Sequence, residues 1–287
     1  VAQLAMVRFK ATGDKIGSLI VNPGGPGESG VQAAVSMLGM LPDSVRERFD
    51  LVGFDPRGVA GSTPAVWCNS DADNDRLRAD PQVDYTPEGV EHIENETKEF
   101  VQRCVDKMGK EFLENVGTVN VAKDLDSMRK ALGDEKLTYL GYSYGTRIGS
   151  AYAEAFPKNV RAMVLDGAVD PEQDAVESLV AQGQGFGTAF TQFAKWCTAQ
   201  QDCALGQDAS AAVKVFQNLV RPLIDFPVPV GDGRKLSYED ATTGVIQALY
   251  QESLWDTLNT GLNELKQQRG ATLEKLADIY NERDSDG

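Results

Sequence analysis

Residues 136–157, KLTYLGYSYGTRIGSAYAEAFP, join an apolar run to a helical pattern through the pentapeptide GYSYG. A glycine-flanked serine is common by chance, so the flanking sequence decides its meaning. The run LTYLGY predicts a strand that ends at Tyr142, and TRIGSAYAEAF predicts a helix. A serine on such a turn is lifted clear of the sheet, and its neighbours must be small because the helix doubles back across the strand. The stretch therefore predicts an α/β fold with Ser143 as a candidate nucleophile.

The glycine-rich stretch NPGGPGESG, residues 22–30, follows an earlier apolar run. In isolation it would predict only a tight turn and a helix start. It lacks the GxxxxGK[ST] and GxGxxG patterns of phosphate-binding loops. Paired with a downstream serine turn, it predicts a loop whose backbone amides stabilise a developing oxyanion. We expect the donors to be the amides of Tyr144, at the helix start, and of Gly25, with Gly24 as the alternative.

Strand and helix patterns alternate along the first 170 residues. Apolar runs without strict alternation, typical of strands covered on both faces, occupy residues 3–9, 16–22, 49–55, 137–142 and 160–166. Helical patterns occupy residues 29–40, 86–108, 121–132 and 144–155. This order predicts a mostly parallel sheet with helices on both faces.

The character of the sequence changes after Asp170-Pro171. Helical patterns then occupy residues 172–198, 207–224, 237–250 and 253–282, with FPVPVGDGRK as an internal loop. We therefore expect residues 1–170 to form the sheet-containing core and residues 171–287 to form a helical cap.

The chain is acidic, with 43 Asp and Glu against 28 Lys and Arg, a net charge of -15. A nucleic acid or an anionic membrane surface would be repelled on average, so we expect neither as a partner. No run approaches the ~20 apolar residues that span a bilayer, and no signal-peptide pattern opens the chain. Because the first residues, VAQLAMVRF, already read as a strand, we expect the natural start to be missing. Membrane attachment is left open only through an amino-terminal anchor.

The four cysteines fall into two sequence-local groups without a CxxC spacing, namely Cys68 and Cys104, then Cys197 and Cys203. This spacing argues against a metal site and against thioredoxin-like chemistry. Two states stay open, four reduced thiols or two disulfides. The simplest of the three pairings joins Cys68 to Cys104 and Cys197 to Cys203. The disulfide state would indicate an exported protein.

The segment FDPRGVAGST, residues 54–63, ends another predicted strand. Asp55 and Arg57 are close enough along the chain to bind one another by charge-assisted hydrogen bonds. We expect this pair to support the loop rather than to bind substrate.

Four motifs, NPGGPGESG, FDPRGVAGS, LGYSYGTR and VRAMVLDGAVDP, occur in this order and spacing. Together they resemble the exported tripeptidyl aminopeptidase and proline iminopeptidase branch of the α/β-hydrolases, above all its mycobacterial cell-envelope members, over essentially the whole chain. The resemblance implies an α/β-hydrolase core under a helical cap, and a serine hydrolase acting on peptides and also on simple esters, outside the cell or in its envelope. It implies Ser143 as nucleophile, the amides of Gly25 and Tyr144 as the oxyanion hole, and no cofactor or metal.

Members of that branch carry an acidic residue and then a histidine after the cap, in the order Ser, Asp, His. This chain ends within its cap-like region, at YNERDSDG. Its one histidine, His92, precedes the serine in a charged helical pattern typical of a surface. Asp166 and Asp170 are weak candidates for the acid. We therefore expect the chain to be incomplete at both ends, nearly inactive alone, and completed by the carboxy-terminal remainder of the same enzyme.

Two alternative functions stay open. A carboxylesterase or lipase of the same fold would place an acyl group in an apolar pocket of the cap. A non-catalytic binding module would keep the scaffold and lack the base. An aminopeptidase needs carboxylates that hold the substrate ammonium group, and the sequence singles out none of five candidates, Glu28, Glu172, Glu177, Glu239 and Glu252.

Overall fold

The computed structural model describes residues 1–283. These residues form two compact units, one made of Val1–Cys68 and Val101–Asp174, the other of Asn69–Phe100 and the residues from Ala175 onward. The assignment of residues 1–170 to a core and 171–287 to a cap stays a prediction. The compact units cut the chain differently, because residues 69–100 group with the later helices.

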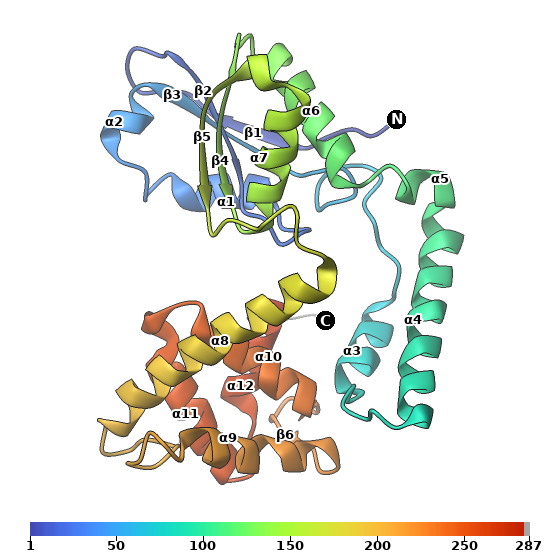
Figure 1. Ribbon diagram of the computed structural model, residues 1–287, viewed down its shortest axis with the longest axis vertical. Helices are drawn as coiled ribbons and strands as arrows, with labels where there is room; N and C mark the ends of the chain where they lie inside the picture. The colour runs from blue at the N-terminus through green and yellow to red at the C-terminus, as the bar shows by residue number, and fades with distance from the viewer. Residues whose placement is uncertain (284–287) are drawn as a thin grey trace. The chain divides into compact units, whose positions relative to one another are not determined.

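The first unit contains a five-stranded sheet in the order β1-β3-β2-β4-β5 (Figure 1). The strands are β1 Met6–Phe9, β2 Gly17–Asn22, β3 Phe49–Phe54, β4 Leu137–Tyr142 and β5 Val160–Asp166. β1 runs antiparallel to β3, and the other three pairings are parallel. The predicted mostly parallel sheet is confirmed.

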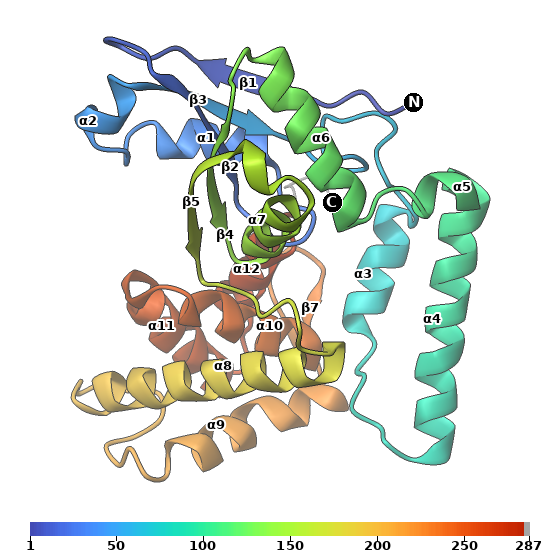
Figure 2. The ribbon, with the colours of Figure 1, turned by 45° about the horizontal axis from the view of Figure 1, so that its top comes forward.

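Helices cover both faces of this sheet (Figures 1 and 2). The helices of the first unit are α1 Gly30–Met37, α2 Asp43–Arg46, α5 Lys110–Leu113, α6 Thr118–Ala131, α7 Tyr144–Ala155 and the short 3₁₀ helix η1 Pro157–Asn159. Ile20 and Val52 pack with α6 and α7, whereas Leu19, Val21 and Leu51 pack with α1. Successive side chains of a strand point to opposite faces, so these aliphatic strands build a core on each side.

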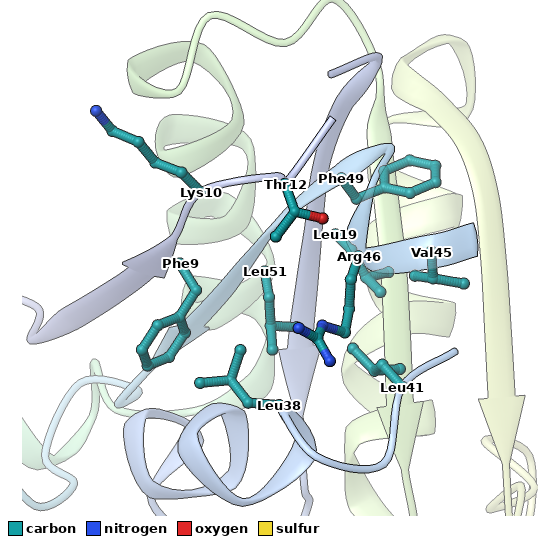
Figure 3. Close-up of a pocket in the computed structure, with 10 residues that line it drawn as sticks. All are labelled: Phe9, Lys10, Thr12, Leu19, Leu38, Leu41, Val45, Arg46, Phe49 and Leu51. Atoms are coloured by element: carbon teal, nitrogen blue, oxygen red, sulfur yellow. The ribbon is translucent and has the colours of Figure 1, made fainter. Parts of the chain in front are cut away.

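A small cavity of about 60 Å³ lies on the α1 face of the sheet. Phe9, Leu38 and Leu51 point toward it, whereas Lys10 extends away from the other lining side chains (Figure 3). The cavity is small and mostly apolar, and Ser143 does not line it. We regard it as a packing gap between the sheet and the segment that leads to α2.

The second unit is mostly helical (Figure 2). Its elements are α3 Asp71–Ala79, the first part of α4 Pro87–Met108, α8 Ala175–Thr198, α9 Ala212–Val220, η2 Arg221–Ile224, α10 Tyr238–Leu249, η3 Glu252–Leu254, α11 Trp255–Lys266 and α12 Ala271–Tyr280. The expected loop at residues 226–235 takes part in a short hairpin, in which β6 Val228–Pro229 pairs with β7 Lys235–Leu236. None of the helices described is both long and apolar enough to cross a membrane.

The helix predicted over residues 253–282 is interrupted between α11 and α12. Gln268 has φ 57°, a left-handed conformation that a helix cannot contain. Gly270 packs closely against Leu236, since a Cβ added at residue 270 would lie 2.5 Å from the Leu236 Cβ. No local pattern reveals this contact, which requires glycine just before α12.

Charged side chains join α3 to the helical part of the second unit. Arg78 of α3 binds Asp240 at 2.8 Å and Asp278 at 3.0 Å. Arg234 binds Asp278 and Glu274, each at 2.9 Å. These ion pairs span α3, α10 and α12, and they explain why residues 69–100 group with elements more than 130 positions later in the sequence.

Candidate active site

Ser143 occupies a sharp turn between β4 and α7, with φ 49° and ψ -123°. A non-glycine residue rarely has positive φ, because its Cβ then crowds the following carbonyl oxygen. The Ser143 amide donates to the carbonyl of Asp166 at 2.9 Å, and the Ser143 carbonyl accepts from the amide and hydroxyl of Thr146 at 2.9 and 2.6 Å. Three hydrogen bonds therefore hold a strained backbone in place, which is typical of a functional turn.

The glycines on either side of Ser143 are required by close backbone contacts. A Cβ on Gly141 would lie 2.6 Å from the carbonyl oxygen of Gly145. A Cβ on Gly145 would lie 2.7 Å from the carbonyl oxygen of Asn22 on the neighbouring strand. Both distances are well below van der Waals contact. The GxSxG spacing thus follows from the tight packing of α7 against β4 and β2.

The Ser143 hydroxyl is accessible. The residue is exposed at the start of α7, and its side chain accepts no capping hydrogen bond from the helix amides. The hydrogen bonds of Ser143 within residues 1–283 all involve its backbone, and its hydroxyl makes none. The hydroxyl therefore stands free beside the amino terminus of a helix, where the dipole favours negative charge.

The loop that begins at Asn22 packs directly on this turn. Gly24 has φ +104°, and a Cβ added there would lie 2.6 Å from the carbonyl oxygen of Tyr142 and 2.8 Å from the amide nitrogen of Tyr144. The same Cβ would lie 3.0 Å from the Cβ of Ser143. Only glycine allows the loop to come this close to the nucleophile.

The hydrogen bonds of this loop separate the two candidate donors. The amide of Gly24 donates to Oδ1 of Asn22 at 3.0 Å and is therefore engaged. The amide of Gly25 has no acceptor in the described part of the chain. The same holds for the amide of Tyr144, which lies in the first turn of α7, where no intrahelical carbonyl is within reach. The pattern favours Gly25 over Gly24 as the second donor.

Asn22 is a residue that the sequence did not single out. It is the last residue of β2, pairs in register with Gly141 and is 1% exposed. Its Oδ1 holds Gly24 and lies 2.8 Å from the position of a Gly145 Cβ, so one side chain touches both the loop and the serine turn. Its buried Nδ2 has no hydrogen-bond partner within residues 1–283, and an unsatisfied buried donor destabilises the folded state by about 1–3 kcal/mol. The available signal was an Asn before a turn, which commonly bonds the backbone two residues on.

Asp55 and Arg57 do not bind one another, so that prediction is wrong. Asp55 is 3% exposed and accepts hydrogen bonds from the hydroxyl of Ser29 at 2.7 Å and from the amide of Val31 at 3.1 Å. Arg57 forms a two-pronged pair with Asp124 of α6, at 2.7 and 2.6 Å. The Asp55 carboxylate is turned inward to the start of α1, whereas Arg57 reaches out to α6. Both support the loops around the turn, but separately.

The histidine and the two weak acid candidates have other partners or surroundings. His92 belongs to the second unit, has a side chain 53% exposed, and places Nε2 2.7 Å from Oδ2 of Asp80, which raises the pKa of the imidazole. Asp170 accepts the amide of Glu172 at 2.9 Å in a local turn. Asp166 lies beside Ser143 through its backbone carbonyl and has an exposed side chain. The first unit, which carries Ser143, contains no histidine.

The five candidate glutamates are divided between the units. Glu28 and Glu172 belong to the first unit, and Glu177, Glu239 and Glu252 belong to the second. Glu28 lies within the glycine-rich loop, where a Cβ on Gly25 would be 3.4 Å from its Cγ. Glu239 accepts the amide of Gln82 at 3.0 Å. Which of them contacts a substrate amine stays a prediction.

Two disulfides join Cys68 to Cys104 and Cys197 to Cys203, with Cα–Cα distances of 4.5 and 5.1 Å. The simplest predicted pairing is confirmed, and the reduced alternative is wrong.

Comparison with known proteins gives consistent relatives. Over its whole length the chain is 64% identical to serine protease Hip1 of Mycobacterium tuberculosis (strain ATCC 25618 / H37Rv), of which it covers 56%. It is 49% identical to carboxylesterase B of the same organism, of which it covers 55%. It is 35% identical to tripeptidyl aminopeptidase of Streptomyces coelicolor, over 78% of this chain and 45% of that protein. The chain thus spans about half the length of these relatives.

These relatives confirm the resemblance inferred from the four motifs. The family model for the alpha/beta hydrolase fold matches residues 17–280, which include the sheet from β2 onward, the serine turn and nearly all of the second unit. With the parallel sheet and the strained serine turn, this match shows that the chain belongs to the alpha/beta hydrolase fold family.

Proposed function

We propose that this chain is the nucleophile-bearing part of a serine hydrolase that removes short peptides from the amino termini of its substrates. One observation carries the proposal. The exposed hydroxyl of Ser143 stands at the amino terminus of α7 beside the free amide of Tyr144, and the loop that carries the free amide of Gly25 packs on the same turn through Gly24. Comparable donors contribute about 10²–10³ to the rate of acyl transfer.

In this mechanism Ser143 Oγ attacks the scissile carbonyl carbon and a base takes the hydroxyl proton. The carbonyl oxygen becomes an oxyanion that accepts hydrogen bonds from Tyr144 and Gly25. The base then returns the proton to the leaving amine, which departs and leaves an ester on Ser143. Water, activated by the same base, hydrolyses this acyl-enzyme.

We further propose that the base and its acidic partner come from polypeptide outside these 287 residues. The first unit has no histidine, and the one histidine of the chain is bound to Asp80. The outer edge of β5 pairs with no strand among residues 1–283, and the side chain of Val164, on one face of that strand, is 60% exposed. An unpaired edge of a parallel sheet with an uncovered apolar side chain is suited to further strands and a covering element. The greater length of the relatives supports the same proposal.

Two disulfides indicate export to an oxidising compartment, which we propose as the site of action. The peptide preference rests on the likeness to the Streptomyces tripeptidyl aminopeptidase and to serine protease Hip1. The likeness to carboxylesterase B favours ester cleavage as a second candidate at the same serine.

Hydrolysis of a tripeptide anilide tests the proposal in the longest available form of the protein. We expect cleavage with a free amino terminus, loss of cleavage when the terminus is acetylated, and no activity for Ser143→Ala. Ser150→Ala is the matched control, because Ser150 lies on the same helix and its hydroxyl only donates to the carbonyl of Thr146. Equal rates on free and acetylated substrates would refute the preference for a free amino terminus, and activity in Ser143→Ala would refute Ser143 as the nucleophile for peptides and esters alike.

A further inference from the structure

The second unit contains a cavity of about 350 Å³ between α8, α9 and α10. Its buried wall is formed by Phe190, Val220 and Val245, and two further rings, Phe186 and Phe216, line its more open part. The volume is more than twice that of the ~150 Å³ apolar cavity known to hold a benzene molecule. It also falls within the range of small-molecule sites, which are mostly apolar with a few polar groups at the rim.

The one charged side chain that lines this cavity is Arg221, at the start of η2. Within the described residues, the guanidinium group of Arg221 takes part in no ion pair or hydrogen bond. By contrast, Arg78 and Arg234 of the same unit are each bound by two or more carboxylates. Arg221 is exposed at the rim of this cavity, so its guanidinium group is open to an external anion beside the apolar lining.

Helix α8 supplies an independent observation. Gly183, Gly185 and Gly187 lie inside this helix, although glycine is among the least favourable residues in a helix interior. A Cβ added to any of the three would meet no atom within 4 Å, so packing inside the unit does not require glycine. Gly187 lines the cavity, and its missing side chain keeps that wall open.

We propose that this cavity binds a monocarboxylate with an apolar chain, of the fatty-acid type. The chain would lie among the phenyl rings, and the carboxylate would pair with Arg221, whose planar fork matches the two carboxylate oxygens. A neutral apolar ligand would leave the arginine unused, and a cationic ligand would be repelled by it. The proposal stands on the second unit alone and does not depend on the role of Ser143.

Displacement of a fluorescent probe, dansylaminoundecanoic acid, by saturated fatty acids of six to fourteen carbons measures the binding. We expect affinity to rise about fourfold per added methylene until the chain fills the cavity, and then to level off. Decanol should displace the probe more weakly than decanoate. Absence of displacement by every acid in the series would overturn the proposal.

Gly187→Leu places a side chain in the cavity and should weaken decanoate binding at least about tenfold. Gly185→Leu is the matched control, since it makes the same substitution in the same helix at a residue that does not line the cavity. Both changes improve helix propensity, so both variants should fold. Equal affinities in the two variants would contradict the cavity assignment.

Arg221→Gln tests the head group. We expect it to reduce decanoate affinity about tenfold and to leave decanol affinity unchanged. Equal losses for the acid and the alcohol, or none for the acid, would refute the pairing with Arg221. The same decanoate titration is repeated on a longer form of the protein. If the 287-residue chain binds decanoate and the longer form does not, further polypeptide covers the cavity and the proposal is overturned.

Discussion

Substitution of Gly24 by alanine tests two separate reasons why this position of the glycine-rich loop requires glycine. The first reason is conformational, because Gly24 has φ +104°. The second is spatial, because the new Cβ would lie 2.8 Å from the Tyr144 amide nitrogen and 3.0 Å from the Ser143 Cβ. The first affects stability, and the second acts on the atoms that we assign to catalysis.

Gly27→Ala is a control that isolates the first reason. Gly27 lies in the same loop with φ +113°, and a Cβ there would meet no atom within 4 Å. An alanine at either residue should lose about 1–2 kcal/mol of stability from the left-handed backbone. Only the Gly24 variant has to displace the Tyr144 amide, and loss of one oxyanion donor costs about 10²–10³ in rate.

Peptide hydrolysis rates and urea unfolding curves, measured side by side on variants of the longest available form of the protein, test this reasoning. We expect Gly27→Ala to keep a turnover number within about threefold of the unmodified protein and Gly24→Ala to lose at least about a hundredfold. Equal turnover numbers in two folded variants would refute the assignment of Tyr144 as a donor. The comparison is made at saturating substrate, so that changes in KM do not enter.

Three further predictions concern other residues. Asn22→Ala frees the Gly24 amide and should lower the turnover number about tenfold with little change in KM, because the loop and not the substrate pocket is disturbed. Replacing Cys68 by serine opens a bridge with a sequence separation of 36, and should cost about 4 kcal/mol in urea unfolding, against about 2 for Cys197, whose separation is 6. Burial and the charge of Asp240 raise the pKa of Glu274 from 4.5 to about 7. Between these two pH values the folded state binds more protons than the unfolded state, so the free energy of unfolding falls as pH rises from 4.5 to about 7. A glutamine side chain cannot ionise, so the stability of Glu274→Gln relative to the unmodified protein should rise by about 1–3 kcal/mol from pH 5 to pH 8. A constant difference across that range would contradict the buried ionisation.

The parts of the fold that depend on local sequence were predictable. The aliphatic runs around Ile20 and Val52 indicate strands covered on both faces, and the GxSxG pattern between a strand and a helix indicates the serine turn. Helix α3 was missed because it is highly charged and has no apolar stripe. Its signal was the capping box of Ser70 and Asp73, in which each side chain bonds the other residue's amide.

The parts that depend on pairing between distant elements were not predictable. Asp55 lies two residues from Arg57, yet its partners are Ser29 and Val31, whereas Arg57 binds Asp124. Spacing along the chain cannot reveal which side of the backbone a side chain takes in the core. The role of Asn22 likewise depends on the contact between β2 and α7, which only the packed structure contains.

Labelling with a fluorophosphonate probe, followed by mass spectrometry of the peptides, tests the central claim most directly. In the longest available form of the protein we predict one adduct, on Ser143, and none in Ser143→Ala. The 287-residue chain alone should react at least about a hundredfold more slowly, because general-base assistance is worth about 10²–10⁴ in rate and its first unit has no imidazole. An adduct that persists in Ser143→Ala, or one found on another serine, would contradict the account.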